Sequence, residues 1–190
     1  MNKNDALLKD IRERLSDFRY THSLEVAESA KRLALKYGYD EEAAYTAGLA
    51  HDVLKELSRE EFSAFFEKEG IMLTAVEASA MKLWHAMAGA RYLEKEYGLA
   101  EEIITAVRYH TTGRAGMSLL EKILFIADFI SLDRNYNGVE DMRKRAEISL
   151  EYAMEEGLRF TIEDLARECK PIHPDTVSCY NEILAITKQK

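Results

Sequence analysis

The sequence places acidic and imidazole side chains inside segments that are otherwise apolar. His51 stands directly before Asp52 in GLAHDVLKEL, and Asp128 lies within EKILFIADFISL. Burying an ionised carboxylate costs several kcal/mol unless a cation or a hydrogen-bond network compensates it. Consecutive helix positions differ by about 100°, so both side chains of the His-Asp pair can reach one cation. A bound metal ion would therefore neutralise both carboxylates.

Three further histidines can complete a metal-binding set. His22, His85 and His110 each lie on, or at the end of, an amphipathic helical segment. Neutral imidazoles combined with carboxylates suit iron, manganese, cobalt, nickel or zinc better than calcium or a thiolate zinc site. Six candidate ligands exceed the needs of one tetrahedral ion, so a dinuclear centre bridged by Asp52 would use the surplus.

The same residues also admit a purely structural interpretation. A single histidine on an apolar helix face is more often a hydrogen-bonded core residue than a ligand, and a His-Asp dipeptide arises readily by chance. Asp128 can pair with Arg134 or Lys122 without any metal. Residue types and spacing alone leave the two interpretations open.

Basic residues near these positions suit an anionic ligand. Lys55 lies about one helical turn after the His-Asp pair, and Arg134 follows the segment that holds Asp128. A guanidinium group binds phosphate through two parallel hydrogen bonds, and Arg19, three residues before His22, is a second candidate for such a contact. An ordinary solvated surface charge is the alternative for each.

Two loop segments offer further contacts to an anion. Thr111, Thr112 and Gly113 end the segment that holds His110, and the glycine allows backbone N–H groups to approach a phosphate oxygen. The second segment, 172–177, contains a proline and begins a helix, so its N–H groups can point at phosphate or ribose. A plain turn at the start of a helix explains it equally well.

The elements that must position these residues are predicted to be helices. Apolar residues recur at helical spacing along most of the chain, and no long stretch alternates apolar and polar positions as a strand would. Ser58 with Glu61 and Ser118 with Glu121 have capping-box spacing. We expect a single all-α domain with about ten helices, near 5–16, 19–37, 40–55, 59–69, 75–83, 86–97, 100–111, 118–131, 140–156, 161–168 and 175–187.

Composition excludes several classes of protein. The 190 residues carry 26 Lys plus Arg against 34 Asp plus Glu, a formal net charge of −8, which disfavours a nucleic-acid polymer as partner. Only two cysteines occur, Cys169 and Cys179, so we expect reduced thiols. Charged residues interrupt the N-terminal apolar run, and no run approaches the roughly 20 residues of a membrane span. We expect a soluble cytoplasmic protein without membrane contact.

The order His22, His51-Asp52, His85, His110 and Asp128 resembles the pattern of the HD-domain metal-dependent phosphohydrolases. The resemblance spans most of the chain. Finer features are similar to the bacterial symmetrical bis(5′-nucleosyl)-tetraphosphatases within that superfamily: RYTHSLEVA, HDVLK, YHTTG, LEKILFIADFISLDR, GVEDMR and IHPDT. One departure is Tyr180 in SCYNEI, where the family has an arginine, which puts adenine or ribose contacts there in doubt.

This resemblance implies a fold, a metal and a reaction. It implies one HD-type helical bundle over 1–190, with a metal-site core at about 18–135 and C-terminal helices at 139–190 that contribute to the nucleotide pocket. It also implies an iron-containing enzyme, for which Mn, Co, Ni or Zn can substitute, that splits diadenosine tetraphosphate into two ADP. A metal-activated hydroxide would attack the phosphoanhydride.

The resemblance also assigns roles to residues. The first ion would be held by His22, His51, Asp52 and Asp128, and His85 and His110 would hold a second ion or face the phosphates as donors. The implied catalytic residues are Asp52, Lys55, His85 and His110. The implied substrate contacts are His22, Asp52, Val53, Leu54, Lys55, His85, His110, Thr111, Asp128, Arg134, Ile172, His173, Pro174, Asp175, Thr176 and Val177.

Three other functions remain open on the sequence. One is another HD-type nucleotide phosphohydrolase, such as a nucleotidase or a phosphodiesterase. The second is a di-iron oxygenase, because related His/Asp sites bind O₂. The third is a non-catalytic helical module with structural histidines. The sequence also leaves open how many iron ions bind and whether the protein forms a homodimer. It does not decide between adenine and guanine.

Overall fold

The computed structural model describes residues 3–188, and this part of the chain is helical, without strands. The predicted all-α fold is therefore confirmed. The described helices are α1 (Lys3–Arg14), α2 (Asp17–Tyr37), α3 (Glu41–Ala50), α4 (Arg59–Glu69), α5 (Ala75–Ser79), the 3-10 helix η1 (Met81–Leu83), α6 (Trp84–Tyr97), α7 (Glu101–Tyr109), α8 (Leu119–Ile130), α9 (Val139–Ile148), α10 (Leu150–Arg167) and α11 (Pro174–Thr187).

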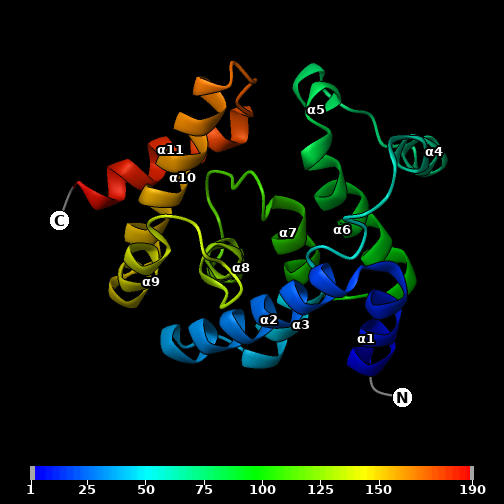
Figure 1. Ribbon diagram of the computed structural model, residues 1–190, viewed down its shortest axis with the longest axis horizontal. Helices are drawn as coiled ribbons and strands as arrows, with labels where there is room; N and C mark the ends of the chain where they lie inside the picture. The colour runs from blue at the N-terminus through cyan, green and yellow to red at the C-terminus, as the bar shows by residue number, and fades with distance from the viewer. Residues whose placement is uncertain (1–2, 189–190) are drawn as a thin grey trace.

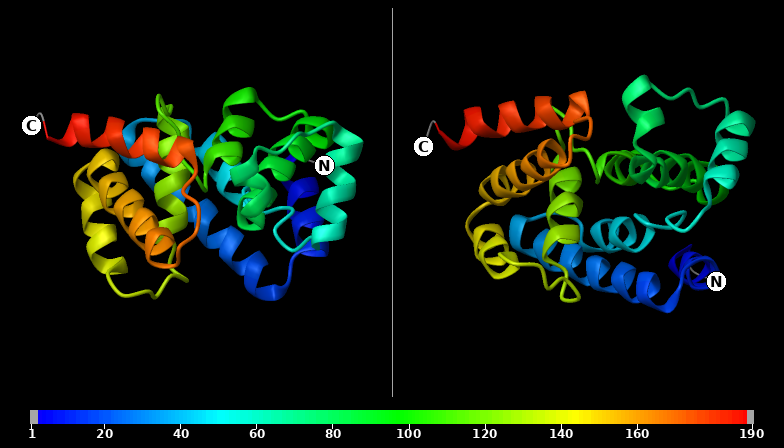
Figure 2. Two further views of the ribbon diagram at one scale, coloured as in Figure 1. Left: turned by 90° about the horizontal axis from the view of Figure 1, so that it is seen from above. Right: turned by 45° about the horizontal axis from the view of Figure 1, so that its top comes forward.

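Helix α8 lies at the centre of the molecule (Figure 1) and packs against α2, α3, α7, α9 and α10. Its sequence is apolar on nearly every side, which is typical of a helix enclosed by others. The antiparallel pair α10 and α11 covers one side, while α4, α5 and α6 lie on the other (Figure 2). No helix within residues 3–188 is long and apolar enough to cross a membrane.

The signals for helix ends operate as the sequence predicts. Ser58, Thr74 and Ser118 each form a capping box with the glutamate three residues later. The helices α2, α4 and α6 are each followed by a glycine in the left-handed conformation, at φ of 72°, 66° and 51°. These caps satisfy backbone groups that a helix end leaves unpaired.

The helix expected over 40–55 ends earlier in the structure. Helix α3 ends at Ala50, and residues 51–56 form consecutive turns. Val53 N–H donates to the Ala50 carbonyl at 3.1 Å, and Lys55 N–H donates to the Asp52 carbonyl at 2.8 Å. These i→i+3 bonds are tighter than those of an α-helix. The His-Asp pair therefore lies on a turn after α3.

The expected helices over 140–156 and 161–168 are divided at the wrong place. The chain breaks at Ser149, in extended conformation, whose hydroxyl accepts from Tyr152 N–H and caps α10. Gly157 remains inside α10, where an added Cβ would make ordinary van der Waals contact with the Phe129 ring at 3.4 Å. The break between the two helices therefore occurs at the capping serine. The glycine, which would weaken a helix, does not interrupt α10.

Gly48 allows α2 and α3 to approach closely. A Cβ at this position would lie 2.6 Å from the Ala27 Cα and 2.8 Å from the Ala27 nitrogen, both backbone atoms that cannot move aside. The Gly48 carbonyl also accepts a hydrogen bond from His51 at 2.7 Å. One glycine therefore sets both the helix spacing and the position of a candidate ligand.

We predict that Gly48→Ala lowers the free energy of unfolding by about 2–3 kcal/mol, because the new methyl group overpacks a rigid contact. Urea denaturation measures this change. Gly89→Ala is the matched control, since a Cβ there meets Val53 at an ordinary 3.6 Å. Removing that helical glycine should be neutral or stabilise by up to about 1 kcal/mol. Equal effects of the two substitutions would contradict the steric argument.

Candidate metal centre

The six residues singled out as candidate ligands converge at the contact between α2, α3, α7 and α8. His22 lies on α2, the His-Asp pair follows α3, and Asp128 lies on α8. His85 is in the first turn of α6, and His110 caps the C-terminal end of α7. The His22 and His51 ring centroids are 5.3 Å apart, and those of His51 and His110 are 5.1 Å apart.

Three of the histidines are anchored through one ring nitrogen. His51 and His110 each contact the backbone carbonyl three residues earlier through Nδ1, at 2.7 Å. His22 Nδ1 lies 2.7 Å from the carboxylate of Asp133. A carbonyl can only accept, so Nδ1 donates in His51 and His110, and each neutral ring keeps a free lone pair on Nε2. Such an outer partner is a common feature of metal-binding histidines, because it fixes ring orientation and tautomer.

Two buried atoms at the centre lack a hydrogen-bond partner. His51 Nε2 and Asp52 Oδ1 are both enclosed and make no regular hydrogen bond, although the Lys55 ammonium group forms an ion pair with Asp52 Oδ1. Asp52 Oδ1 lies 3.1 Å from His85 Nε2 and 3.7 Å from His110 Nε2, while Asp52 Oδ2 lies 3.5 Å from His51 Nε2. Buried polar atoms are rarely left unsatisfied, so these two mark a place for a missing ligand or ion.

The ligand atoms form two overlapping groups suited to a divalent cation. In the first group, the ligand atoms of His22, His51 and Asp128 lie within 4.8 Å of one another. In the second group, the ligand atoms of His51, Asp52 and His110 also lie within 4.8 Å of one another. His51 is common to both. The mixed nitrogen and oxygen donors match the preferences of iron, manganese, cobalt, nickel and zinc. The residues present therefore fit a bound metal.

Both carboxylates are held in the ionised form. Burial alone would raise the pKa of Asp52, but neighbouring His51, His110 and His85 hold it well below its usual range. Burial likewise opposes ionisation of Asp128, and the contact with His22 and the charge of Arg134 lower its pKa well below the usual range. The site therefore offers negative ligands to a cation at neutral pH.

His85 differs from the three anchored histidines. Burial, reinforced by the charge of Lys55, lowers the pKa of His85 to about 4, although contact with Asp52 opposes this shift. Its Nε2 lies 2.9 Å from Lys55 Nζ and 3.1 Å from His110 Nε2. The ring is therefore neutral at pH 7 and turned toward an ammonium group.

Three basic side chains surround the centre and remain partly exposed. Lys55 Nζ lies 3.2 Å from Asp52 Oδ1, and Arg19 Nη1 lies 3.6 Å from Asp52 Oδ2. Arg134 pairs with the Asp128 carboxylate and also donates to its backbone carbonyl at 2.8 Å. These cations can contact an anionic ligand that reaches the metal centre.

A cleft of about 420 Å³ adjoins the metal centre on one side. Five of the predicted contact residues line it, with apolar and lysine side chains from the start of η1 and from the junction of α10 and α11. The lining residues are Lys55, Ser79, Ala80, Met81, Lys82, Leu83, His85, Thr111, Thr112, Thr161, Leu165, Lys170, Pro171, His173 and Thr176. Its size is typical of a small-molecule site.

Other residues predicted to touch substrate do not line the cleft. Val53 and Leu54 are buried in the hydrophobic core. Tyr180 is half-buried and packs against that core. Five predicted contacts lie at the metal centre and outside the cleft lining: His22, Asp52, His110, Asp128 and Arg134. Four others, around the start of α11, are also outside the lining: Ile172, Pro174, Asp175 and Val177.

Sequence reasoning missed two carboxylates that support the site. Asp133, in the loop after α8, contacts His22 Nδ1. Glu77, which also caps α5, accepts from Arg108 through its buried Oε1 at 3.0 Å, and this oxygen lies 3.6 Å from His173 Nε2. Neither shows a local signal, because each partner is distant in the chain.

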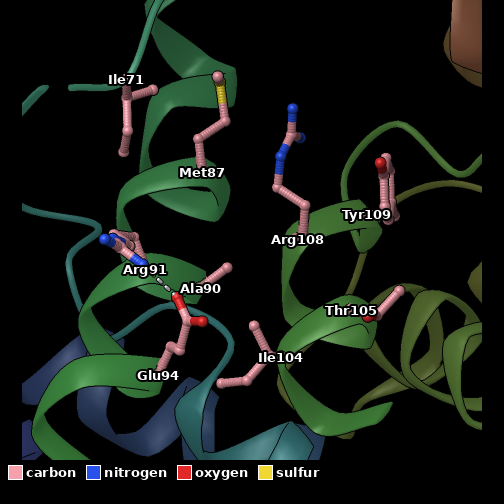
Figure 3. Close-up of a pocket in the computed structure, with 9 residues that line it drawn as sticks. All are labelled: Ile71, Met87, Ala90, Arg91, Glu94, Ile104, Thr105, Arg108 and Tyr109. Carbon is pink, nitrogen blue, oxygen red and sulfur yellow. Dashed lines mark hydrogen bonds and ion pairs between the residues drawn. The ribbon is translucent and has the colours of Figure 1, made fainter. Parts of the chain in front are cut away.

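A second groove lies between α6 and α7, and Figure 3 shows its side chains. Arg91 donates to Glu94 on the same helix, α6, at 2.6 Å, while Arg108 on α7 extends away from this pair and donates to Glu77. The groove contains none of the six candidate ligands. Its lining residues are Ile71, Met87, Ala90, Arg91, Glu94, Ile104, Thr105, Arg108 and Tyr109.

Comparison with known proteins identifies the family. The HD domain family matches residues 19–135. The chain is 35% identical over 97% of its length to the symmetrical bis(5′-nucleosyl)-tetraphosphatase of Bacillus subtilis, of which it covers 99%. It is 38% identical over 97% of its length to the protein of the same name from Halalkalibacterium halodurans, of which it covers 98%.

A solved structure shares the fold across the chain. The crystal structure of a predicted HD superfamily hydrolase involved in NAD metabolism from Clostridium acetobutylicum matches with a TM-score of 0.92 and 35% identity, covering 96% of this chain and 97% of that one. Sequence and structure therefore agree that this chain belongs to the HD-domain hydrolases and, within them, to the family of symmetrical bis(5′-nucleosyl)-tetraphosphatases.

Proposed function

We propose that this protein hydrolyses diadenosine tetraphosphate, and related dinucleoside polyphosphates, symmetrically to two nucleoside diphosphates. The observation that carries the proposal is the convergence of buried imidazole and carboxylate ligand atoms, two of them without a regular hydrogen bond, beside a cleft lined with lysines. The names of the relatives that match nearly the whole chain support the same substrate.

The proposed first ion is held by His22, His51, Asp52 and Asp128, with iron as the metal and Mn, Co, Ni or Zn as substitutes. When bound, such an ion lowers the pKa of water toward neutrality and polarises a phosphoryl oxygen. The contact between His51 and the Gly48 carbonyl supports this assignment, because it directs Nε2 inward.

His85 and His110 can hold a second ion or donate to the phosphates. In the described part of the chain, His85 Nδ1 does not contact a backbone carbonyl or a carboxylate as Nδ1 of the other three histidines does. Both ring nitrogens of His85 lie within 3.5 Å of Lys55 Nζ. This arrangement favours a role for His85 as a phosphate contact. His110, whose Nδ1 is anchored, remains suited to a metal.

The cleft residues would bind one nucleotide of the substrate. Lys55 lies at the end nearest the metal centre, where its ammonium group can stabilise negative charge on the phosphates. Leu83 and Leu165 offer apolar surfaces for a base, while His173 and Thr176 offer polar contacts to ribose or phosphate. Arg134 would contact phosphate from the other side of the centre.

We predict that Asp52→Ala removes bound metal from the purified protein, leaving less than about a tenth of the wild-type content, because a central charged ligand is lost. Elemental analysis by mass spectrometry of protein purified without oxygen measures this content. Asp141→Ala is the control, because that exposed carboxylate pairs with Arg145 and not with a candidate ligand. Full metal content in Asp52→Ala would refute the ligand assignment.

We predict that diadenosine tetraphosphate is converted to ADP alone, because the scissile bond is placed between two equivalent halves. Chromatography of the products at early times checks this outcome. AMP appearing with ATP would indicate asymmetric cleavage. Release of inorganic phosphate from mononucleotides would instead indicate a nucleotidase.

We predict that Lys55→Ala lowers kcat/KM for diadenosine tetraphosphate by about 100-fold, since removing one group that stabilises transition-state charge typically costs this much. Metal content should stay at the wild-type level. Lys144→Ala, at an exposed position on α9, serves as the control and should leave kcat/KM unchanged. An unchanged rate in Lys55→Ala would exclude Lys55 from the reaction.

A further inference from the structure

Three charged side chains at the metal centre are partly exposed although they do not line the cleft, and we call them the second face of the centre. The Asp128 side chain is 22% exposed and that of Arg134 is 35% exposed, yet neither lines the cleft. Arg19 is also outside the lining, and its side chain is 30% exposed. A ligand bound at the centre can therefore extend toward these residues as well as into the cleft.

An exposed aromatic ring lies beside this second face. Phe18 is 68% exposed, and the Arg19 guanidinium carbon lies 5.6 Å from its ring centroid. Phe18 and Arg19 are in the first turn of α2, four and three positions before His22, so all three lie on one side of the helix. Arg19 also reaches the Asp52 carboxylate. The ring is thus adjacent to a cation that contacts the metal centre.

Symmetric cleavage requires room for two nucleotides. The scissile bond must lie at the metal centre, so the two halves of the substrate leave it in different directions. The cleft of about 420 Å³ is suited to one nucleotide. The second nucleotide needs cations for its phosphates and a flat apolar surface for its base, and the second face offers both.

We propose that Phe18 and Arg19 form the subsite for the second nucleotide, in which the base stacks on the Phe18 ring and Arg19 contacts the phosphates. This inference rests on the proposed function and deepens it, because it assigns selectivity for dinucleotides over mononucleotides to one side chain. Stacking on an aromatic ring is tolerant of base identity, so the subsite accepts different bases.

The test compares two probes with the metal-loaded enzyme: diadenosine tetraphosphate and adenosine 5′-tetraphosphate, which lacks the second nucleoside. Phe18→Ala should lower kcat/KM for diadenosine tetraphosphate about five- to tenfold, mainly through KM, the lower range for loss of one stacking contact. The value for adenosine 5′-tetraphosphate should not change. Phe18→Trp should restore selectivity, because it restores an aromatic face.

Leu35→Ala provides a matched control. Leu35 is also on α2 and is also 68% exposed, but it lies 13 residues beyond His22, about 20 Å along the helix axis. It should leave both substrates unaffected. If Phe18→Ala behaves as Leu35→Ala does, or lowers kcat/KM equally for both probes, the subsite is overturned while symmetric hydrolysis stands.

Equilibrium binding separates this inference from the proposed function. Calorimetry on the metal-loaded protein should give tighter binding of diadenosine tetraphosphate than of adenosine 5′-tetraphosphate, and Phe18→Ala should remove the difference. If that pattern appears without any hydrolysis, the subsite stands and the proposed function fails. If the wild-type protein binds both probes equally, the subsite is overturned whatever the activity.

Discussion

The burial of a carboxylate beside an imidazole is the constraint on which the rest of the site depends. Asp52 and His51 are almost completely enclosed, and each keeps one polar atom without a hydrogen-bond partner. Leaving a buried polar atom unpaired costs about 1–3 kcal/mol, and more for a charged group. Lys55 and Arg19 offset part of this cost for Asp52, and a cation at the centre would offset more.

The precision of this centre comes from backbone contacts as much as from the ligands. Gly48 lets α3 approach the backbone of Ala27 in α2, and its carbonyl orients His51. The same helix α2 carries His22, so one helix contact sets the separation of two candidate ligands. Helix α8, packed at the centre of the bundle, adds Asp128 from a third direction.

Local charge at the site is opposite to that of the whole protein. The chain has a formal net charge of −8, yet Lys55 faces the cleft, and Arg19 and Arg134 face the other side of the centre. A metal ion would add to these cations, so an anionic nucleotide would meet a positive local field despite the acidic surface. Cations on both sides of the centre would suit the two nucleotide halves of the proposed substrate.

The sequence by itself determined the all-α fold, the capped helix ends and the residue types that could hold a metal, because apolar spacing, caps and buried charges are local properties. Tertiary structure decided the end of α3 at Ala50, the support of His22 by Asp133, and a cleft completed by Leu165 from a distant helix. These features depend on contacts between residues far apart in the chain. Their energies appear only when the helices pack, so no local pattern records them.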